Sequence, residues 1–146
     1  DTFASRAGKV VRDELGLAYY FFSTIAATRG QGPWVVRMGV NPRNVDRALQ
    51  TTLAELRVVL DGGFPQVDLE LAQDKLVGEL RIALESPAGI AQMVLEAELF
   101  ELGLDHYERY AEQLRSVTRD QVIETARAFL LAGRYALAIA GPPLEA

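Results

Sequence analysis

The stretch VRDELGLAYYFFS, residues 11–23, decides the fold of this chain because it joins a helix to a strand through one glycine. The residues before it keep helical spacing, and Gly16 readily adopts the left-handed conformation that ends a helix. From Ala18 onward, aromatic and β-branched residues favour a strand. The pattern therefore places Arg12 in the last helical turn and Tyr19 near the start of the strand. We expect the two side chains to face one opening.

Two β-rich runs, residues 18–28 and 34–40, flank a short loop with two glycines. This spacing predicts an antiparallel hairpin, and the loop lacks the Lys-Ser/Thr pair of a phosphate-binding loop. The second run alternates apolar residues with others, which is typical of a strand with one face on a core. The inward set comprises Trp34, Val36, Met38 and Val40. We expect Arg37 to point away from the core.

Helices are predicted to follow the hairpin. Asn41 and Pro42 supply a cap and a first-turn proline for a helix that ends at Gly62 and Gly63. Further helical spacing covers residues 69–85, 90–103 and 107–114, with an interruption at Ser86 and Pro87. A capping box, Thr118 with Gln121, then begins another helix.

The last apolar run, Tyr135 to Ala140, is short and uncharged, as expected for a strand inside a covered sheet. Strands at both ends with a helical block between them indicate an α+β fold. We predict a two-layer sandwich with the helices on one face of a mainly antiparallel sheet. Residues 1–146 are expected to form a single domain, because about half of the chain is apolar and a core of this size needs no disulfide.

The composition excludes several classes of function. A formal net charge of −5 argues against binding to a phosphate backbone, so no nucleic-acid partner is predicted. The longest uncharged apolar stretch, residues 15–28, is shorter than the ~20 residues that a membrane-spanning helix needs. The absence of cysteine removes thiolate metal sites but leaves the compartment open between cytoplasm and periplasm.

A catalytic zinc site is not predicted in this chain. Such a site needs imidazole or carboxylate ligands that converge on the metal and leave one position for water. The only histidine is His106, and no second ligand follows it at helical spacing. We interpret His106 as a surface or helix-start residue. We therefore predict no catalytic residue and no cofactor in this chain, which is not expected to cleave peptides alone.

The sequence Arg12-Asp13-Glu14-Leu15-Gly16-Leu17-Ala18-Tyr19 resembles the R-x-x-x-G-L-x-Y motif of the pitrilysin, insulysin and mitochondrial-processing-peptidase family of zinc peptidases. In that family the motif belongs to the C-terminal, non-catalytic domains. The resemblance continues along most of the chain, although its other matches are ordinary helix and strand punctuation. These are Gly39 to Pro42, Leu69 to Glu85, Ser116 to Thr118, and Ile139 to Pro142.

The resemblance implies a function. The chain would be the substrate-binding half of a zinc metallopeptidase, in which Arg12 and Tyr19 reach towards the peptide substrate. The zinc would be bound by H-x-x-E-H in a partner half, on the same polypeptide or on a separate subunit. Halves of this family normally begin with a strand ahead of the Arg/Tyr helix. The resemblance therefore implies that residues 1–146 are a fragment that lacks this N-terminal strand.

Simpler interpretations remain for both motif residues. A cation in the last turn of a helix interacts favourably with the exposed carbonyls there, and a tyrosine can be a core ring with a hydrated hydroxyl. A structural subunit of the same fold without a proteolytic role is an alternative function, because the family also includes scaffold relatives. A free-standing, ligand-binding α+β domain is a third.

Overall fold

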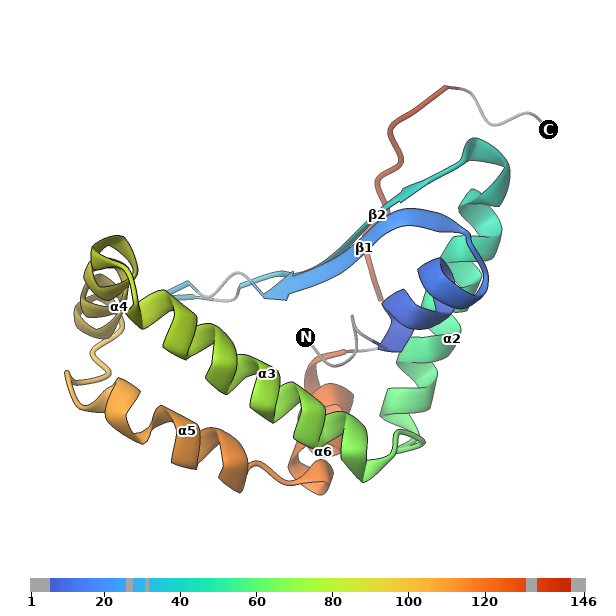
Figure 1. Ribbon diagram of the computed structural model, residues 1–146. Coiled ribbons are helices and arrows are strands. Elements are labelled where there is room, and N and C mark those ends of the chain that lie inside the picture. The colour runs from blue at the N-terminus through green and yellow to red at the C-terminus, as the bar shows by residue number, and fades with distance from the viewer. Residues whose placement is uncertain (1–5, 26–27, 31, 131–133, 143–146) are drawn as a thin grey trace. The chain divides into compact units, whose positions relative to one another are not determined.

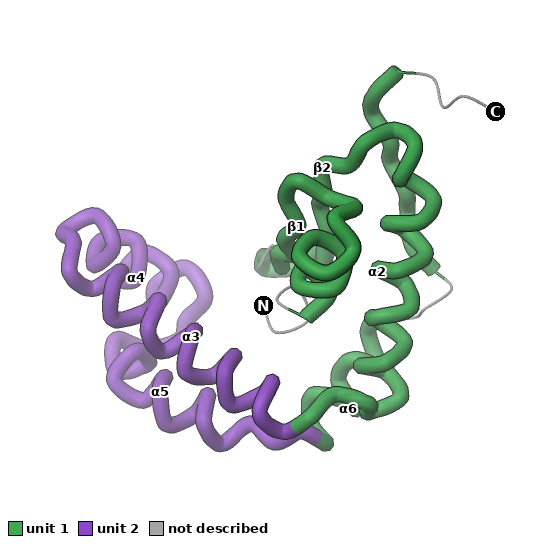
Figure 2. Tube along the Cα trace, turned by 45° about the vertical axis from the view of Figure 1, so that its right-hand side comes forward, with its two compact units in different colours: residues 1–65, 120–146 green, residues 66–119 purple. Residues whose placement is uncertain are grey.

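The computed structural model describes residues 6–25, 28–30, 32–130 and 134–142, and it divides into two compact units. Unit 1 comprises residues 1–65 and 120–146, and unit 2 comprises residues 66–119 (Figure 2). The described part of the chain combines helices with an antiparallel sheet, which confirms the predicted α+β class. None of the described helices is long and apolar enough to cross a membrane.

Unit 1 is built on a β-hairpin with helices beside it (Figure 1). Its elements are η1 (Lys9–Glu14), β1 (Ala18–Ile25), β2 (Trp34–Val40), η2 (Pro42–Asn44), α2 (Val45–Leu60) and α6 (Arg119–Phe129). The two strands pair antiparallel, with Ala18 opposite Val40 at one end and Ile25 opposite Trp34 at the other. The predicted hairpin is therefore confirmed, and Arg37 is exposed as expected.

The core of unit 1 lies between η1, the hairpin and α2. Val11, Leu17, Ala18 and Ala48 form its buried cluster, and Phe21, Met38 and Val40 pack against them. Met38 and Val40 belong to the alternating set of β2, so the period-two pattern correctly identified the inward face. This packing joins the helix that carries Arg12 to the strand that carries Tyr19.

A side-chain cap begins η2, the turn that leads into α2, and a further hydrogen bond holds the end of α2. The side chain of Asn41 accepts a hydrogen bond from the backbone N–H of Arg43 at 3.1 Å, and Pro42 opens the turn, as predicted. The buried residues of α2 recur at helical spacing: Ala48, Thr52, Leu56 and Val59. At the other end, the Nε of Arg127 in α6 donates to the carbonyl of Leu60 at 2.7 Å. This bond ties α6 to α2.

Unit 2 contains α3 (Gln66–Leu84), α4 (Pro87–Leu99) and α5 (His106–Ser116). The predicted break between α3 and α4 is confirmed, because Ser86 caps α4 by accepting from the N–H of Gly89 at 3.0 Å. The amide of Gln73 in α3 donates to the carbonyls of Leu114 and Val117, each at 2.9 Å. These two bonds hold the end of α5 against α3.

The predicted C-terminal strand is wrong for the residues that the structure describes. Residues 134–142 form no strand, and Tyr135, Leu137 and Ile139 are 55%, 54% and 52% exposed. The sheet formed by the described residues has two strands, β1 and β2. A strand requires a hydrogen-bonding neighbour, and among the described residues no strand pairs with residues 135–140.

Candidate functional site

Arg12 lies in a π-helix, an uncommon local structure. In η1 the N–H of Leu15 bonds to the carbonyl of Val10 at 3.0 Å, and that of Leu17 bonds to Val11 at 2.8 Å. These hydrogen bonds span five and six residues and widen the last turn beyond the four-residue spacing of an α-helix. Such turns are rare and are frequently found at functional sites. The prediction that Arg12 lies in the last turn of its helix is confirmed.

Gly16 turns the chain from η1 into β1. Its φ angle is +61°, which lies in the left-handed region that residues with a Cβ adopt only at a cost. An added Cβ would meet no atom within 4 Å, so conformation and not space explains the glycine. The predicted helix end at Gly16 is confirmed. Leu17 and Ala18, both buried, then anchor the start of the strand.

The guanidinium of Arg12 is held only loosely. Its Nε lies 3.5 Å from a carboxylate oxygen of Asp13, and the two side chains are 59% and 62% exposed. Ion pairs between such exposed groups contribute little free energy and exchange readily with water. Arg12 can therefore leave Asp13 for a carbonyl or carboxylate of an incoming ligand at small cost.

Tyr19 lies at an irregularity in the strand pairing. Ala18 is opposite Val40 and Tyr20 is opposite Gly39, so Tyr19 is an extra residue without a partner in the register. An unpaired extra residue of this kind bends a strand and redirects its side chain, and such bulges are common beside active sites. Tyr19 is 78% exposed, so the alternative in which its ring is part of the core is wrong.

Two of the three aromatic residues that follow Tyr19 on β1 are partly exposed. The rings of Tyr20 and Phe22 stack with centroids 5.6 Å apart, and they are 50% and 42% exposed. Tyr20 lies against Gly39, where an added Cβ would clash with the ring. Both rings are therefore partly open to solvent.

Arg12 and Tyr19 thus occupy the two sides of one junction in unit 1, each exposed and each in an irregular backbone segment. Sequence periodicity gave no sign of the π-helix or of the bulge, because both depend on a single residue added to an otherwise regular pattern. The expectation that the two side chains face one opening stays a prediction.

The histidine does not form a metal site. His106 is the first residue of α5, which agrees with its interpretation as a helix-start residue. The centroid of its ring lies 5.0 Å from that of Tyr107 and 6.0 Å from that of Tyr110. Among the described residues, no group of three or more His, Cys, Asp or Glu side chains could hold a metal ion. The side chains of these residues therefore do not fit a zinc ion.

Tyr107 is the neighbour of His106 with a perturbed phenol. Burial raises the pKa of Tyr107 above its ordinary value of 10.0, and the carboxylate of Glu96 raises it further. The hydroxyl donates a hydrogen bond to Glu96 at 3.3 Å, and Gln92 donates to the other oxygen of the same carboxylate at 2.6 Å. This network joins α4 to α5.

Comparison with known protein families identifies the family of this chain. A family model described as peptidase M16 inactive domain matches residues 1–76, which is more than half of the chain. The chain belongs to this family of peptidase M16 inactive domains. The predicted family is thereby confirmed. No curated protein matches the chain.

Solved structures share the fold at low sequence identity. A peptidase M16 inactive domain from Pseudomonas fluorescens, known from a crystal structure, is 22% identical in sequence. The match covers 87% of this chain and 30% of that protein, with a TM-score of 0.77. A protease from Helicobacter pylori is 16% identical in sequence. The match covers 90% of this chain and 34% of that protein, with a TM-score of 0.78. A conserved protein from Enterococcus faecalis V583 is 20% identical in sequence. The match covers 86% of this chain and 31% of that protein, with a TM-score of 0.69. The chain thus spans about a third of the length of these proteins.

Proposed function

We propose that this chain is the substrate-binding, non-catalytic half of a zinc metallopeptidase. The observation that carries the proposal is the position of the Arg/Tyr motif in a peptidase M16 inactive domain, with Arg12 and Tyr19 both exposed at the η1–β1 junction. In this proposal the half completes a chamber and positions the peptide. Hydrolysis takes place at a zinc ion bound by H-x-x-E-H in a partner half.

The two side chains have the chemistry that substrate positioning requires. A guanidinium and a phenol both donate hydrogen bonds to a peptide carbonyl, and both can strengthen those bonds as negative charge develops on the oxygen. Arg12 can do so because its partner, Asp13, is an exposed carboxylate, and Tyr19 can do so because it is exposed at the bulge. Neither group can activate water in this role, so the half positions substrate and does not cleave it.

Substitution of Arg12 in the assembled peptidase tests this role. Arg12→Ala should lower kcat/KM for a peptide substrate by about ten- to a hundredfold, because a hydrogen bond to a charged group is worth about 1.5–3 kcal/mol. Lys9→Ala is the matched control, since Lys9 is an exposed cation in the same π-helix, 4.0 Å from Glu14. Circular dichroism and thermal unfolding show whether each variant remains folded.

The outcomes separate the peptidase from a scaffold of the same fold. A loss of activity in folded Arg12→Ala, with Lys9→Ala close to wild type, supports the positioning role. If the wild-type assembly with zinc cleaves no peptide, the scaffold function replaces the peptidase. If it cleaves and Arg12→Ala matches it, then Arg12 is a structural residue and the site is assigned incorrectly.

A further inference from the structure

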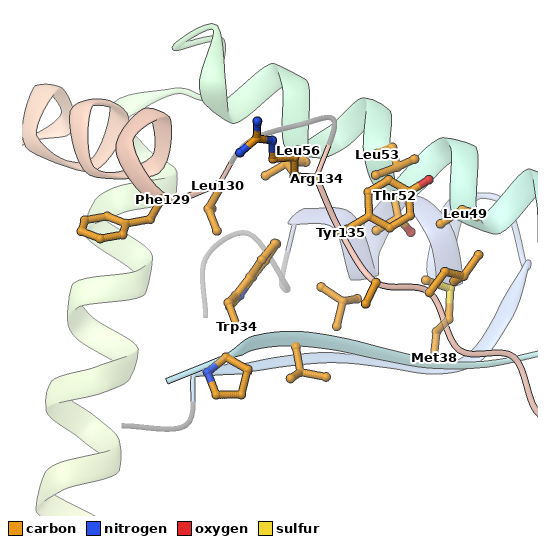
Figure 3. Close-up of a pocket in the computed structure, with 15 residues that line it drawn as sticks. Trp34, Met38, Leu49, Thr52, Leu53, Leu56, Phe129, Leu130, Arg134 and Tyr135 are labelled. Carbon is orange, nitrogen blue, oxygen red and sulfur yellow. The ribbon is translucent and has the colours of Figure 1, made fainter. Parts of the chain in front are cut away.

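The two faces of the β1–β2 hairpin have different surroundings. On the inner face, Trp34 and Met38 of β2 are directed towards the side of α2 and line an apolar cavity of about 500 Å³ in unit 1 (Figure 3). Phe21 of β1 is opposite Met38 and also packs against the core. On the other face, the stacked rings of Tyr20 and Phe22 are partly exposed. This outer face therefore presents aromatic surface to solvent.

The bulge in β1 brings Tyr19 to the outer face as well. Ala18 and Phe21 both face the core, although a regular strand returns to the same face only at every second residue. The extra residue at the bulge accounts for this, and it leaves Tyr19 and Tyr20 together between two inward positions. Both tyrosines are exposed. The outer face thus carries Tyr19, Tyr20 and Phe22 within four positions of β1.

Gly39 makes room for one of these rings. It is the partner of Tyr20 in the strand pairing, and a Cβ at this position would clash with the ring of Tyr20. The ring therefore lies over the backbone of β2 at a point where a side chain is absent. A tyrosine side chain has only two main torsions, so a ring held in this way loses little conformational freedom when a ligand contacts it. The ring pair is preorganised for binding.

The chemistry of this face favours an apolar or aromatic side chain as its ligand. Stacked rings offer flat apolar surface, and aromatic pairs attract each other beyond the effect of the area that they bury. Arg37, opposite Phe22, is the one charged residue of β1 and β2, and neither strand contains a carboxylate. A basic side chain would therefore lie near an arginine and find no counter-ion in the two strands.

We propose that Tyr20 and Phe22 form a subsite that binds a large apolar or aromatic side chain of the peptide substrate and so determines specificity. This inference rests on the proposed function, in which Tyr19 holds a neighbouring peptide group. Phe22 is three residues from Tyr19, which is ~10 Å along a strand, and an extended peptide covers that distance in about three residues. The bound side chain therefore belongs to a residue within about three positions of the scissile bond.

The size and position of the ring pair favour a substrate side chain over a partner protein. A large aromatic side chain offers about 150–250 Å², so two half-exposed rings offer on the order of 200 Å². A stable protein–protein interface buries about 800 Å² on each partner. Tyr20 follows Tyr19 directly on the same face, so a peptide held by Tyr19 passes the ring pair.

Profiling of cleavage sites in the assembled peptidase tests the proposal. A synthetic peptide mixture of diverse sequence is cleaved with zinc present, and mass spectrometry gives the residues preferred at each position. We expect the wild type to prefer large apolar or aromatic residues over basic ones about tenfold or more at one position within three residues of the bond. The double variant Tyr20→Thr/Phe22→Thr should lower this preference about three- to tenfold, because threonine removes the rings but favours a strand. Thr24→Ala, exposed further along β1, is the matched control and should keep the preference.

Gly39→Ala supplies a second test that leaves both rings in the chain. Its Cβ displaces the ring of Tyr20, so the preference should fall at the same position. Tyr20→Phe, which keeps the ring and removes the hydroxyl, should retain the preference. Circular dichroism shows whether each variant is folded, and Gly39→Ala decides the question if the double variant is not.

The outcomes separate this subsite from the proposed function. The subsite is wrong, and the proposed function stands, if Arg12→Ala lowers kcat/KM while the folded double variant keeps the wild-type preference. A wild type that cleaves peptides without preferring apolar or aromatic residues overturns the subsite in the same way. A double variant that loses stability but keeps the preference would show that the rings only pack. If the wild-type assembly with zinc cleaves no peptide, the proposed function and the subsite both fail.

Discussion

The η1–β1 junction of unit 1 and the helices of unit 2 are built in different ways. In unit 2, α4 begins at a serine cap followed by proline, and a buried glutamine satisfies two carbonyls near the end of α5. At the junction, a π-helix and a strand irregularity interrupt regular structure within a few residues of each other. Helix caps and hydrogen bonds to the backbone are sufficient where a helix only has to pack against its neighbours.

Irregular backbone is less favourable, and it persists where the surrounding structure holds it in place. Here Val11, with no exposed surface, and Leu17 fix the junction from inside. Arg12 and Tyr19, the two candidate site residues, lie at its irregular positions. Under the proposed function, we predict that changes in unit 2 alter stability, whereas changes at the junction also alter activity.

The largest expected effect on stability is at Gln73 in unit 2. Gln73→Leu removes both donors to the carbonyls of Leu114 and Val117 and should lower the free energy of unfolding by about 2–3 kcal/mol, measured by urea denaturation. Gln73→Glu keeps the shape of the side chain but places a carboxylate, which cannot donate, beside the same two carbonyls. The decrease in the free energy of unfolding should therefore be at least as large. Activity of the assembled peptidase should be retained wherever the protein remains folded. A loss below about 0.5 kcal/mol would show that these bonds are not structural.

A smaller effect is expected at Gly16, where stability and activity should change together. Gly16→Ala should cost about 1–2 kcal/mol, because alanine is strained at a φ of +61°. Gly16→Asn is the matched variant. Asparagine adopts this conformation more easily than alanine, so this variant should lose less stability. We expect kcat/KM to fall more for alanine than for asparagine. Equal activity in all three proteins would mean that the junction does not position Arg12 relative to Tyr19.

The smallest effect is expected at Tyr107 in unit 2. Tyr107→Phe removes one long hydrogen bond to Glu96 and should change stability by less than about 1 kcal/mol near neutral pH. The folded pKa of Tyr107 is raised above 10.0, so its contribution is present below pH 10 and is lost as the pH rises through the folded value. The difference between wild type and Tyr107→Phe should therefore shrink in strongly alkaline solution. Urea denaturation at pH 8 and above pH 10 measures this difference in stability. A difference that grew with pH would contradict the predicted role of the Tyr107 hydrogen bond.

The sequence predicted those parts of the structure that depend on local chemistry. Gly16 ended the helix, Asn41 and Pro42 began the next one, and the alternation in β2 identified the face on the core. The C-terminal strand was predicted wrongly because pairing is not local. Residues 135–140 have the composition of a strand, but within the described residues no strand lies beside them.

The sequence proposed Arg12 and Tyr19 as candidate site residues, and this role stays a prediction; the geometry around them was not predicted. The motif identified Arg12 and Tyr19, and the family match shows that the motif lies in a peptidase M16 inactive domain. A π-helix and an extra strand residue each shift the register by one position, and hydrophobic periodicity does not resolve a shift of that size. The exposure of Tyr19 therefore became evident only from the pairing of β1 with β2.

A double-mutant cycle on kcat/KM, with Arg12→Ala, Tyr19→Phe and the combined variant in the assembled peptidase, tests the central claim most directly. If both side chains bind the same part of the substrate, their effects should be non-additive, with a coupling free energy of about 0.5–3 kcal/mol. The matched cycle of Arg12→Ala with Tyr20→Phe, which removes the neighbouring hydroxyl, should be additive. Additive effects in both cycles, or no effect of Tyr19→Phe, would contradict the account.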